Sequence, residues 1–267
     1  MNIDAMRARQ SRPSVARTYS YILGGRDNYG PDKDLGDSFK ADLPGSEQLA
    51  ITNRAAVLRA VRTATAAGVR QVIDMGCGLP AEPNVHEIAR RQQPDARIVY
   101  VDNDPFVAPH GRALLAVDDG IAMLEADVRE PRRIFDHPDV QRLIDFDQPV
   151  ALLFSAVLSF VEDEHDPVGV VRFWTDRIAS GSFVYLSHFR PGQTREAAAT
   201  ERKILDAFGG RFRSDAAILA LFDGLELLDD GLLPCRQWHP DADMPTLEQK
   251  ELTSWEELIV AAMARKA

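Results

Sequence analysis

The sequence predicts an α/β protein with a mostly parallel, seven-stranded sheet that follows a helical N-terminal extension. Two observations carry this prediction. After residue 70, short β-rich runs alternate with helical segments, which is the pattern of βαβ units. The first of these runs ends in Asp74-Met75-Gly76-Cys77-Gly78, where two glycines permit a tight turn and a close approach of ligand atoms to the backbone.

The elements can be placed from periodicity and from Gly and Pro punctuation. Residues 1–70 are expected to be broken helices and residues 71–267 one continuous core. The seven expected strands cover residues 71–75, 97–101, 121–126, 150–154, 183–189, 225–228 and 235–239. The expected helices of the core cover 84–93, 106–117, 131–144 (broken at Pro138), 166–179, 194–208, 214–222 and 254–265, with a surface loop at 244–250.

Composition excludes several classes of function. The 267 residues are 45% hydrophobic, enough for a sizeable core, and the net charge of −10 argues against a partner held by its phosphates, as nucleic acid is. The basic cluster Arg7, Arg9, Arg12 and Arg17 is expected to be a solvated helix face. Two cysteines, the lack of an apolar leader and the lack of a membrane-length apolar run predict a cytoplasmic protein with reduced thiols, no structural metal and no membrane partner.

Acidic residues stand where the first three predicted strands end. Asp74 and Asp102 close the first two runs, and Asp127 follows the third. The carboxyl ends of parallel strands share one edge, so we expect these carboxylates to line one crevice. Asp74 suits a ligand ammonium, Asp102 suits paired ribose hydroxyls, and Asp127 suits an exocyclic amine such as adenine N6. For each acid alone, helix capping or solvation is the alternative.

Two adenosine-containing ligands fit such a crevice. Residues 76–81 match the G-x-G-x-x-A fingerprint of dinucleotide-binding proteins, so an NAD(P)-dependent oxidoreductase is one hypothesis. The Asp74 carboxylate would repel a pyrophosphate, however, and Pro80 lacks an amide donor near the helix start. S-adenosylmethionine has no phosphate and carries an ammonium and a sulfonium, so the sequence favours this cofactor.

The motifs 74–78, Asp102 and 126–127 also resemble those of the Rossmann-like S-adenosylmethionine-dependent methyltransferases. More narrowly, residues 17–29 (RTYSYILGGRDNY) are similar to the N-terminal signature of one bacterial subfamily, the S-adenosyl methyltransferases. Segments 78–80, 84–87 and 99–105 are similar to the internal motifs of the same subfamily. The resemblance implies the methyltransferase fold and S-adenosyl-L-methionine as cofactor. The predicted cofactor-binding residues in the core are Asp74, Gly76, Gly78, Asp102, Asn103, Asp127, Val128 and Ser155.

The N-terminal signature is predicted to form a helical lid over the cofactor. Gly25 would let the chain approach the ligand closely, Tyr21 would offer a ring face to the sulfonium, and Asn28 would donate to a carboxylate. The alternative is a helix end and a turn with buried tyrosines.

Two positions depart from the subfamily. Cys77 stands where a threonine is usual, and Ser159 where a histidine is usual, which removes an imidazole near the expected acceptor. His188, at the end of the fifth predicted strand, is then the candidate general base. Holding the acceptor in line with the methyl group supplies much of the rate, so a base is not obligatory.

The expected function is therefore methyl transfer from S-adenosylmethionine to a small molecule. A protein that binds the same cofactor as a sensor, without transferring a methyl group, is the alternative outside the enzymes. The acceptor and the oligomeric state do not follow from the sequence.

Overall fold

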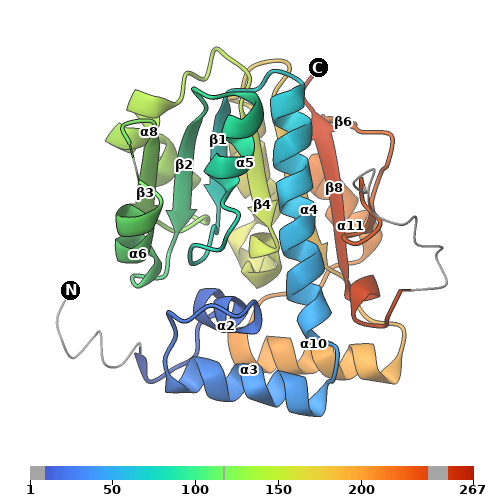
Figure 1. Ribbon diagram of the computed structural model, residues 1–267. Coiled ribbons are helices and arrows are strands. Elements are labelled where there is room, and N and C mark those ends of the chain that lie inside the picture. Colours follow the sequence, from blue (N-terminus) through green and yellow to red (C-terminus); the bar gives the residue numbers. More distant parts are fainter. Residues whose placement is uncertain (1–9, 117, 240–251) are drawn as a thin grey trace.

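The computed structural model describes residues 10–116, 118–239 and 252–267. They form one eight-stranded sheet with helices on both faces and a layer of helices beneath one edge (Figure 1). The strands are β1 (Gln71–Met75), β2 (Arg97–Asp102), β3 (Ile121–Glu125), β4 (Ala151–Ser155), β5 (Phe183–Phe189), β6 (Glu226–Leu227), β7 (Leu233–Pro234) and β8 (Ile259–Arg265). Their order is β3-β2-β1-β4-β5-β8-β6, and β7 pairs with β8 outside this path.

Strands β1 to β5 are parallel, as predicted. β1 lies between β2 and β4, with Ile73 opposite Val99 on one side and Leu152 on the other. The strands are covered on both faces, which explains their nearly continuous apolar runs. Because the chain passes from β3 back to β4 on the other side of β1, the order reverses there and a crevice is expected at the carboxyl ends.

The far edge of the sheet differs from the prediction. Residues 259–265, expected inside a helix over 254–265, form strand β8, which runs antiparallel to β5. The expected strand over 235–239 is also absent; the short β7 precedes it, and both β6 and β7 pair with β8. Six of the seven β8 residues are buried, so its apolar run has no alternation that separates strand from helix.

Helices surround the sheet. The described helices are α2 (Val15–Ile22), α3 (Gly30–Asp42), α4 (Glu47–Ala66), α5 (Val85–Gln92), α6 (Val107–Leu114), α7 (Pro131–Phe135), α8 (Pro138–Leu143), α9 (Pro167–Thr175), α10 (Arg195–Phe208) and α11 (Asp215–Leu219), with short 3₁₀ turns η1 (Val157–Phe160), η2 (Asp163–His165), η3 (Ala220–Phe222) and η5 (Glu256–Leu258).

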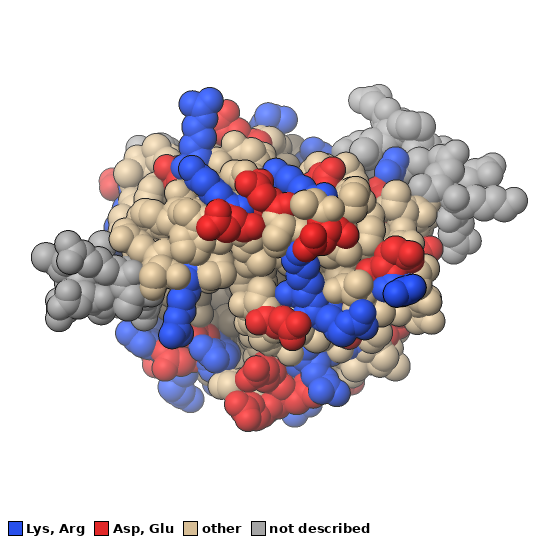
Figure 2. All heavy atoms as spheres, turned by 90° about the horizontal axis from the view of Figure 1, so that it is seen from below, with Lys and Arg blue, Asp and Glu red and all other residues tan. Residues whose placement is uncertain are grey.

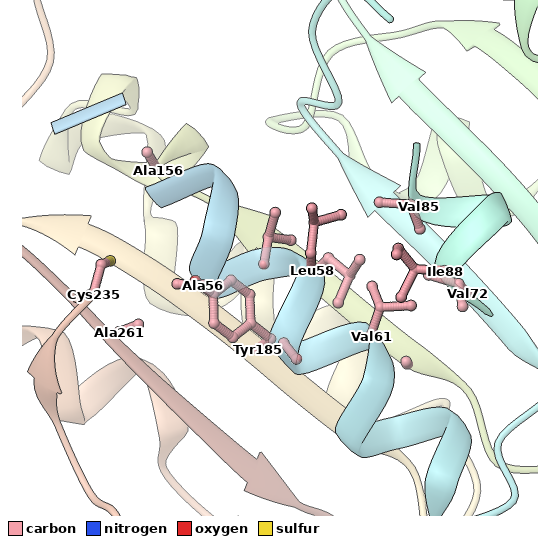
Figure 3. Packing of buried hydrophobic residues seen from close by; sticks show 14 of the residues in the cluster. Ala56, Leu58, Val61, Val72, Val85, Ile88, Ala156, Tyr185, Cys235 and Ala261 are labelled. Atoms are coloured by element: carbon pink, nitrogen blue, oxygen red, sulfur yellow. The ribbon is translucent and has the colours of Figure 1, made fainter. Parts of the chain in front are cut away.

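Helices α4, α5 and α6 pack on one face, and α7, α8, α9 and α11 on the other. Figure 3 shows Leu58 and Val61 of α4 beside Val85 and Ile88 of α5. On the opposite face, Trp174 of α9 is fully buried. The central strands are therefore held from both sides, which fixes the positions of their carboxyl ends.

Residues 10–70 do not pack as one structural unit. Helices α2 and α3 lie beneath the carboxyl ends of the strands, alongside α10 (Figure 1). Helix α4, by contrast, contacts β4, β5 and β8 and contributes Ala56 and Val61 to the core. None of the described helices combines the length and apolar character needed to cross a membrane.

One residue of the N-terminal basic cluster, Arg17, departs from the predicted solvated face. Arg17, expected to be exposed, is only 2% exposed and pairs with two carboxylates. Arg12 is exposed. Arg7, Arg9 and the predicted loop at 244–250 lie outside the described residues.

Candidate functional site

The carboxyl edge of the sheet brings the three predicted acids together. Asp74 is the second-to-last residue of β1, Asp102 ends β2, and Asp127 follows β3. The backbone nitrogen of Gly78 donates to Asp102 Oδ2 at 2.8 Å, and Asn103 Nδ2 donates to Asp127 Oδ2 at 3.3 Å. Hydrogen bonds thus connect the glycine turn to the end of β2, and the end of β2 to the loop after β3.

The two glycines of the turn meet different surroundings. Both have positive φ, +73° at Gly76 and +68° at Gly78, which favours glycine. A Cβ on Gly76 would lie 2.5 Å from Val157 Cγ2, whereas a Cβ on Gly78 would meet no atom within 4 Å. The lack of a side chain at Gly76 therefore allows η1 to pack closely against the turn, whereas Gly78 borders open space that a ligand can occupy.

Burial makes Asp74 and Asp102 weaker acids than a solvated aspartate. Burial raises the pKa of Asp74 to about 7; Arg54 opposes this shift and Asp102 adds to it. Burial also raises the pKa of Asp102 to about 6, against the hydrogen bonds from the Asp104 and Gly78 amides. A cationic or hydroxyl-bearing ligand would compensate such poorly solvated carboxylates.

The third acid is strongly ionised. Burial alone would raise the pKa of Asp127, but hydrogen bonds from the side chain and backbone of Arg129, together with that from Asn103, lower it to about 2. Arg129 Nη2 lies 2.6 Å from Asp127 Oδ2. Asp127 is thus fixed as an acceptor by its own neighbours.

A polar cluster that local sequence patterns do not predict lies near Asp74. Asn53 of α4 donates to the Tyr19 hydroxyl at 3.3 Å, and its Oδ1 accepts from Ser187 at 2.6 Å and from Ser155 at 3.4 Å. Ser155 was predicted; Tyr19, Asn53 and Ser187 were not. Their meeting depends on how α2 and α4 cross the strand ends, and no local pattern records that crossing.

Arg54 of α4 was not predicted from the sequence either. Its Nη2 donates to the carbonyl oxygens of Ala81 and Pro83, beyond the glycine turn. Its Nε is buried and has no hydrogen-bond partner among the residues that the structure describes. Arg54 also lowers the pKa of Asp74, so a cation stands near the acid expected to hold the ligand's ammonium.

The predicted lid residues contact their own segment. The Tyr21 hydroxyl donates to Asp37 at 2.6 Å and its ring faces Lys40. A Cβ on Gly25 would lie 2.1 Å from Ser20 Oγ, so its close approach is to helix α2. Asn28 Nδ2 donates to the Gly25 carbonyl oxygen, while its Oδ1 is buried without a partner in the described part of the chain. Tyr21, Gly25 and Asn28 therefore contact α2, α3 and the turn between them, and their role at the cofactor stays a prediction.

His188 does not have the surroundings of a general base. It is 0% exposed; Nδ1 donates to the Phe189 carbonyl oxygen at 2.7 Å, and Arg213 Nη1 donates to Nε2 at 3.0 Å. Burial is the main cause that lowers its pKa to about 4, and the Arg213 charge adds to this. His188, near the end of β5, is thus covered by Arg213 from a segment 25 residues later in the chain. Its role as a base stays a prediction, and this burial speaks against it.

Ser159 is buried and connects the turn after β4 to β5. It is 1% exposed, and its Oγ accepts from the Phe189 amide at 3.0 Å. The preceding Ala156 has φ +58°, and its amide donates to Ser187 Oγ at 2.9 Å. The turn after β4 is therefore held to the end of β5, and the positive φ at a non-glycine residue shows that its shape is imposed.

A cleft of about 1110 Å³ opens beside these strand ends. Its lining includes Asn103, Asp104 and Asp127 from the sheet edge and Arg12 and Ser14 from the N-terminal segment. Figure 2 shows the molecule from this side, with acidic and basic side chains interspersed. The cleft is thus open at the end of the crevice where Asp127 lies.

One group of side chains in the described residues has metal-ligand spacing. The ligating atoms of Glu162, Glu164 and His165 lie within 4.8 Å of one another on an exposed loop. Exposed acidic groups of this kind are common without an ion, so this group does not indicate a metal centre.

A family model described as S-adenosyl methyltransferase matches residues 2–267. A candidate methyltransferase from Thermobifida fusca YX is 38% identical, with a TM-score of 0.90 and coverage of 96% of both chains. A DUF574 family protein from Streptomyces avermitilis is 36% identical, with a TM-score of 0.89 and coverage of 97% of this chain and 99% of that one.

The N-methyltransferase NodS from Bradyrhizobium japonicum WM9, in complex with S-adenosyl-L-homocysteine, is 14% identical, with a TM-score of 0.50. The match covers 94% of this chain and 98% of that chain, and it shows a similar fold alone. Among curated proteins, none matches this chain. The family match and the fold together establish that the chain belongs to the S-adenosyl methyltransferase family, whose members use S-adenosylmethionine as methyl donor.

Proposed function

We propose that the protein transfers a methyl group from S-adenosylmethionine, held at the carboxyl edge of the sheet, to a small-molecule acceptor. The observation that carries the assignment of the site is the alignment of Asp74, Asp102 and Asp127 at the ends of three adjacent parallel strands, with Gly78 facing open space. In this proposal Asp74 holds the cofactor's ammonium, Asp102 its ribose hydroxyls and Asp127 the adenine amine.

Arg54 completes the proposed cofactor site. Its buried Nε has no partner among the described residues, and it is the main cation acting on Asp74. An amino-acid group carries an ammonium and a carboxylate side by side, so an acid and a guanidinium at one place match it. We assign Arg54 to the carboxylate.

The same features oppose a dinucleotide. The Asp74 carboxylate would stand near the position of a pyrophosphate, and Pro80 offers no amide donor there. A sensor without transfer activity has no support in the family match, which is to methyltransferases.

The bound cofactor supplies an electrophilic methyl group on a sulfonium. The protein's own part is to hold the reactants in line and exclude water. Tyr19, Asn53 and Ser155 form an uncharged polar cluster beside Asp74, suited to orient an acceptor without competing for the methyl group. With His188 buried, we propose no base, and transfer depends on positioning.

A small acceptor fits the surface better than a nucleic acid. The net charge is −10, and on the face beneath the strand ends the described residues show charges of both signs side by side, without a basic stripe (Figure 2). The cleft of about 1110 Å³ is of the order of small-molecule sites. Two free cysteines are consistent with the proposed cytoplasmic location.

We also propose that the cover of the site consists of α2 and α3 rather than of all residues 1–70. Helix α4 packs on the sheet and belongs to the core. The division between cover and core then falls before residue 47.

The proposal is tested by calorimetry followed by an acceptor screen. S-adenosylhomocysteine should bind to the wild-type protein and NADH should not. Extracts of small metabolites incubated with methyl-labelled S-adenosylmethionine should then yield a labelled product that is absent with Asp74→Ala. Tight NADH binding, or labelling confined to nucleic acid, would contradict the proposed site or acceptor.

A further inference from the structure

A buried arginine joins the N-terminal helices to the end of β2. Arg17 of α2 is 2% exposed. Its Nε lies 2.8 Å from Asp32 Oδ2 in α3, and its Nη1 lies 2.9 Å from Asp104 Oδ2, two residues beyond β2. We call Asp32, Arg17 and Asp104 the Arg17 bridge.

On the N-terminal side, the bridge holds both helices together. Asp32 is 0% exposed and accepts from the amide of Ser14 at 3.0 Å and from that of Tyr29 at 2.8 Å. These residues precede α2 and α3 respectively. Asp32 therefore fixes the starts of both helices around the Arg17 guanidinium.

Aromatic rings enclose the guanidinium from both parts of the protein. Its carbon lies 5.5 Å from the centroid of Tyr29, in the N-terminal segment, and 5.1 Å from that of Phe106, just after β2. Tyr29 and Phe106 contact each other edge to face at 5.2 Å. Cation–π attraction to these rings adds to the attraction of the ion pairs, because the guanidinium is buried.

On the core side, the bridge continues into the proposed cofactor site. The Asp104 amide donates to Asp102 Oδ1 at 2.9 Å, and Asp102 Oδ2 accepts from the Gly78 amide at 2.8 Å. An ionised carboxylate has about four acceptor sites, so Asp102 retains capacity for ligand hydroxyls. One continuous set of polar contacts thus runs from α3 through Arg17 to Gly78.

Stability alone does not account for this arrangement. Two carboxylates and one guanidinium are removed from water, and the desolvation of buried charges commonly cancels their attraction. A bridge is useful, however, where the position of one of its members matters. Here that member is Asp104, which orients the carboxylate proposed to hold the ribose.

We infer that Arg17 is a positioning residue for cofactor binding: it docks α2 and α3 against the end of β2 and thereby fixes the orientation of Asp102 and Gly78. The inference rests on the proposed cofactor site. Docking of the N-terminal helices and binding of the cofactor then favour each other, because each stabilises the same arrangement of the β2 end.

The test compares Arg17→Met with a second buried arginine. Arg59 of α4 is also 2% exposed, but its guanidinium donates to the carbonyl oxygens of Trp238 and Cys235 in the C-terminal part. Arg17→Met should weaken S-adenosylhomocysteine binding in calorimetry at least tenfold. Arg59→Met should lower the melting temperature and leave the affinity within twofold of wild type.

Further variants separate positioning from general destabilisation. Arg17→Lys should recover part of the affinity, since an ammonium can still pair with one carboxylate. Asp104→Asn should weaken binding in the same direction, and combining it with Arg17→Met should cost less than the product of the single effects. Amide hydrogen exchange at residues 76–79 should be faster in Arg17→Met than in Arg59→Met.

The outcomes are distinguishable. If the wild-type protein does not bind S-adenosylhomocysteine, the proposed cofactor site is wrong. If the wild type binds and folded Arg17→Met binds within twofold, or if Arg59→Met loses as much affinity, the positioning role is wrong. Should Arg17→Met fail to fold, Arg17→Lys and Asp104→Asn decide by the same criteria.

Discussion

Replacement of Asp74 by asparagine should make the protein more stable and its cofactor binding weaker. The side chain is 3% exposed and lies where β1 meets the glycine turn. Asparagine keeps the size of aspartate but carries no charge. The variant therefore tests whether this acid is retained for a ligand despite what its burial costs.

The size of the effect follows from the pKa of Asp74, which burial raises from 3.8 to about 7. Between these values the native protein holds a proton that the unfolded chain has lost, so stability falls as pH rises through this window. At about 1.4 kcal/mol per unit, the cost reaches about 4 kcal/mol near pH 7 and is constant above it. The asparagine variant is free of this cost.

Melting curves at several pH values measure the stability effect. At pH 8, Asp74→Asn should melt higher than wild type by on the order of 10 °C, the shift that this cost implies for a protein of this size. Below about pH 3, where Asp74 is protonated in both the folded and the unfolded state, the two proteins should melt at nearly the same temperature. Asp118→Asn, at the surface ion pair with Arg90, should show no stabilisation at pH 8.

Calorimetry measures the effect on binding. Loss of a charged hydrogen-bond partner should weaken S-adenosylhomocysteine binding at pH 8 by about 1.5–3 kcal/mol. Wild-type affinity should fall as pH drops below 7, whereas the variant should keep only the dependence from Asp102, whose pKa burial raises to about 6. An unchanged melting temperature at pH 8 would refute the argument from burial, and unchanged affinity would remove Asp74 from the site.

Three further predictions concern neighbouring residues. Asp102→Ala should weaken S-adenosylhomocysteine binding in calorimetry by about 1–3 kcal/mol, because ribose hydroxyls lose a charged acceptor, while circular dichroism stays unchanged. Gly76→Ala should lower the melting temperature more than Gly78→Ala, because only the first Cβ meets Val157 at 2.5 Å; both incur the strain of a positive φ. His188→Gln should lower the melting temperature and leave S-adenosylhomocysteine affinity within twofold.

Each of these predictions has an outcome that contradicts it. Wild-type affinity in folded Asp102→Ala would make Asp102 a loop residue that only holds Gly78. Equal losses of stability in the two glycine variants would mean that Val157 moves aside. A large loss of affinity in a folded His188→Gln would show that the end of β5 reaches the cofactor after all.

The parallel half of the sheet was predictable because its signals are local. The run 71–75 is apolar, β-branched and closed by an acid and glycines, and β1 occupies those same residues. The fifth strand, predicted over 183–189, is also observed with these bounds. In β8, by contrast, three alanines and burial on both faces removed the alternation that marks a strand, so a helix was expected.

The candidate site was only partly predictable for a related reason. Asp74, Asp102 and Asp127 could be placed because strand ends in a parallel sheet share an edge. The surroundings of His188 depend on Arg213, and those of Asp74 on Arg54 of α4. Arg17 looked like one basic residue among several, because its partner Asp104 lies 87 residues away in the chain. Contacts between distant segments leave no trace in local periodicity.

The position of β8 inside the sheet has a consequence for proteolysis near residues 259–265. β8 pairs with β5 from Phe183↔Arg265 to Phe189↔Ile259, and β6 and β7 depend on it in turn. Trimming residues 259–265 would expose the edge of β5, and an unpaired edge invites association with other chains. It would also remove the backbone partner of Ser187, which holds Asn53 and the turn at Ala156. Damage at this end of the chain would therefore reach the cofactor crevice through β5.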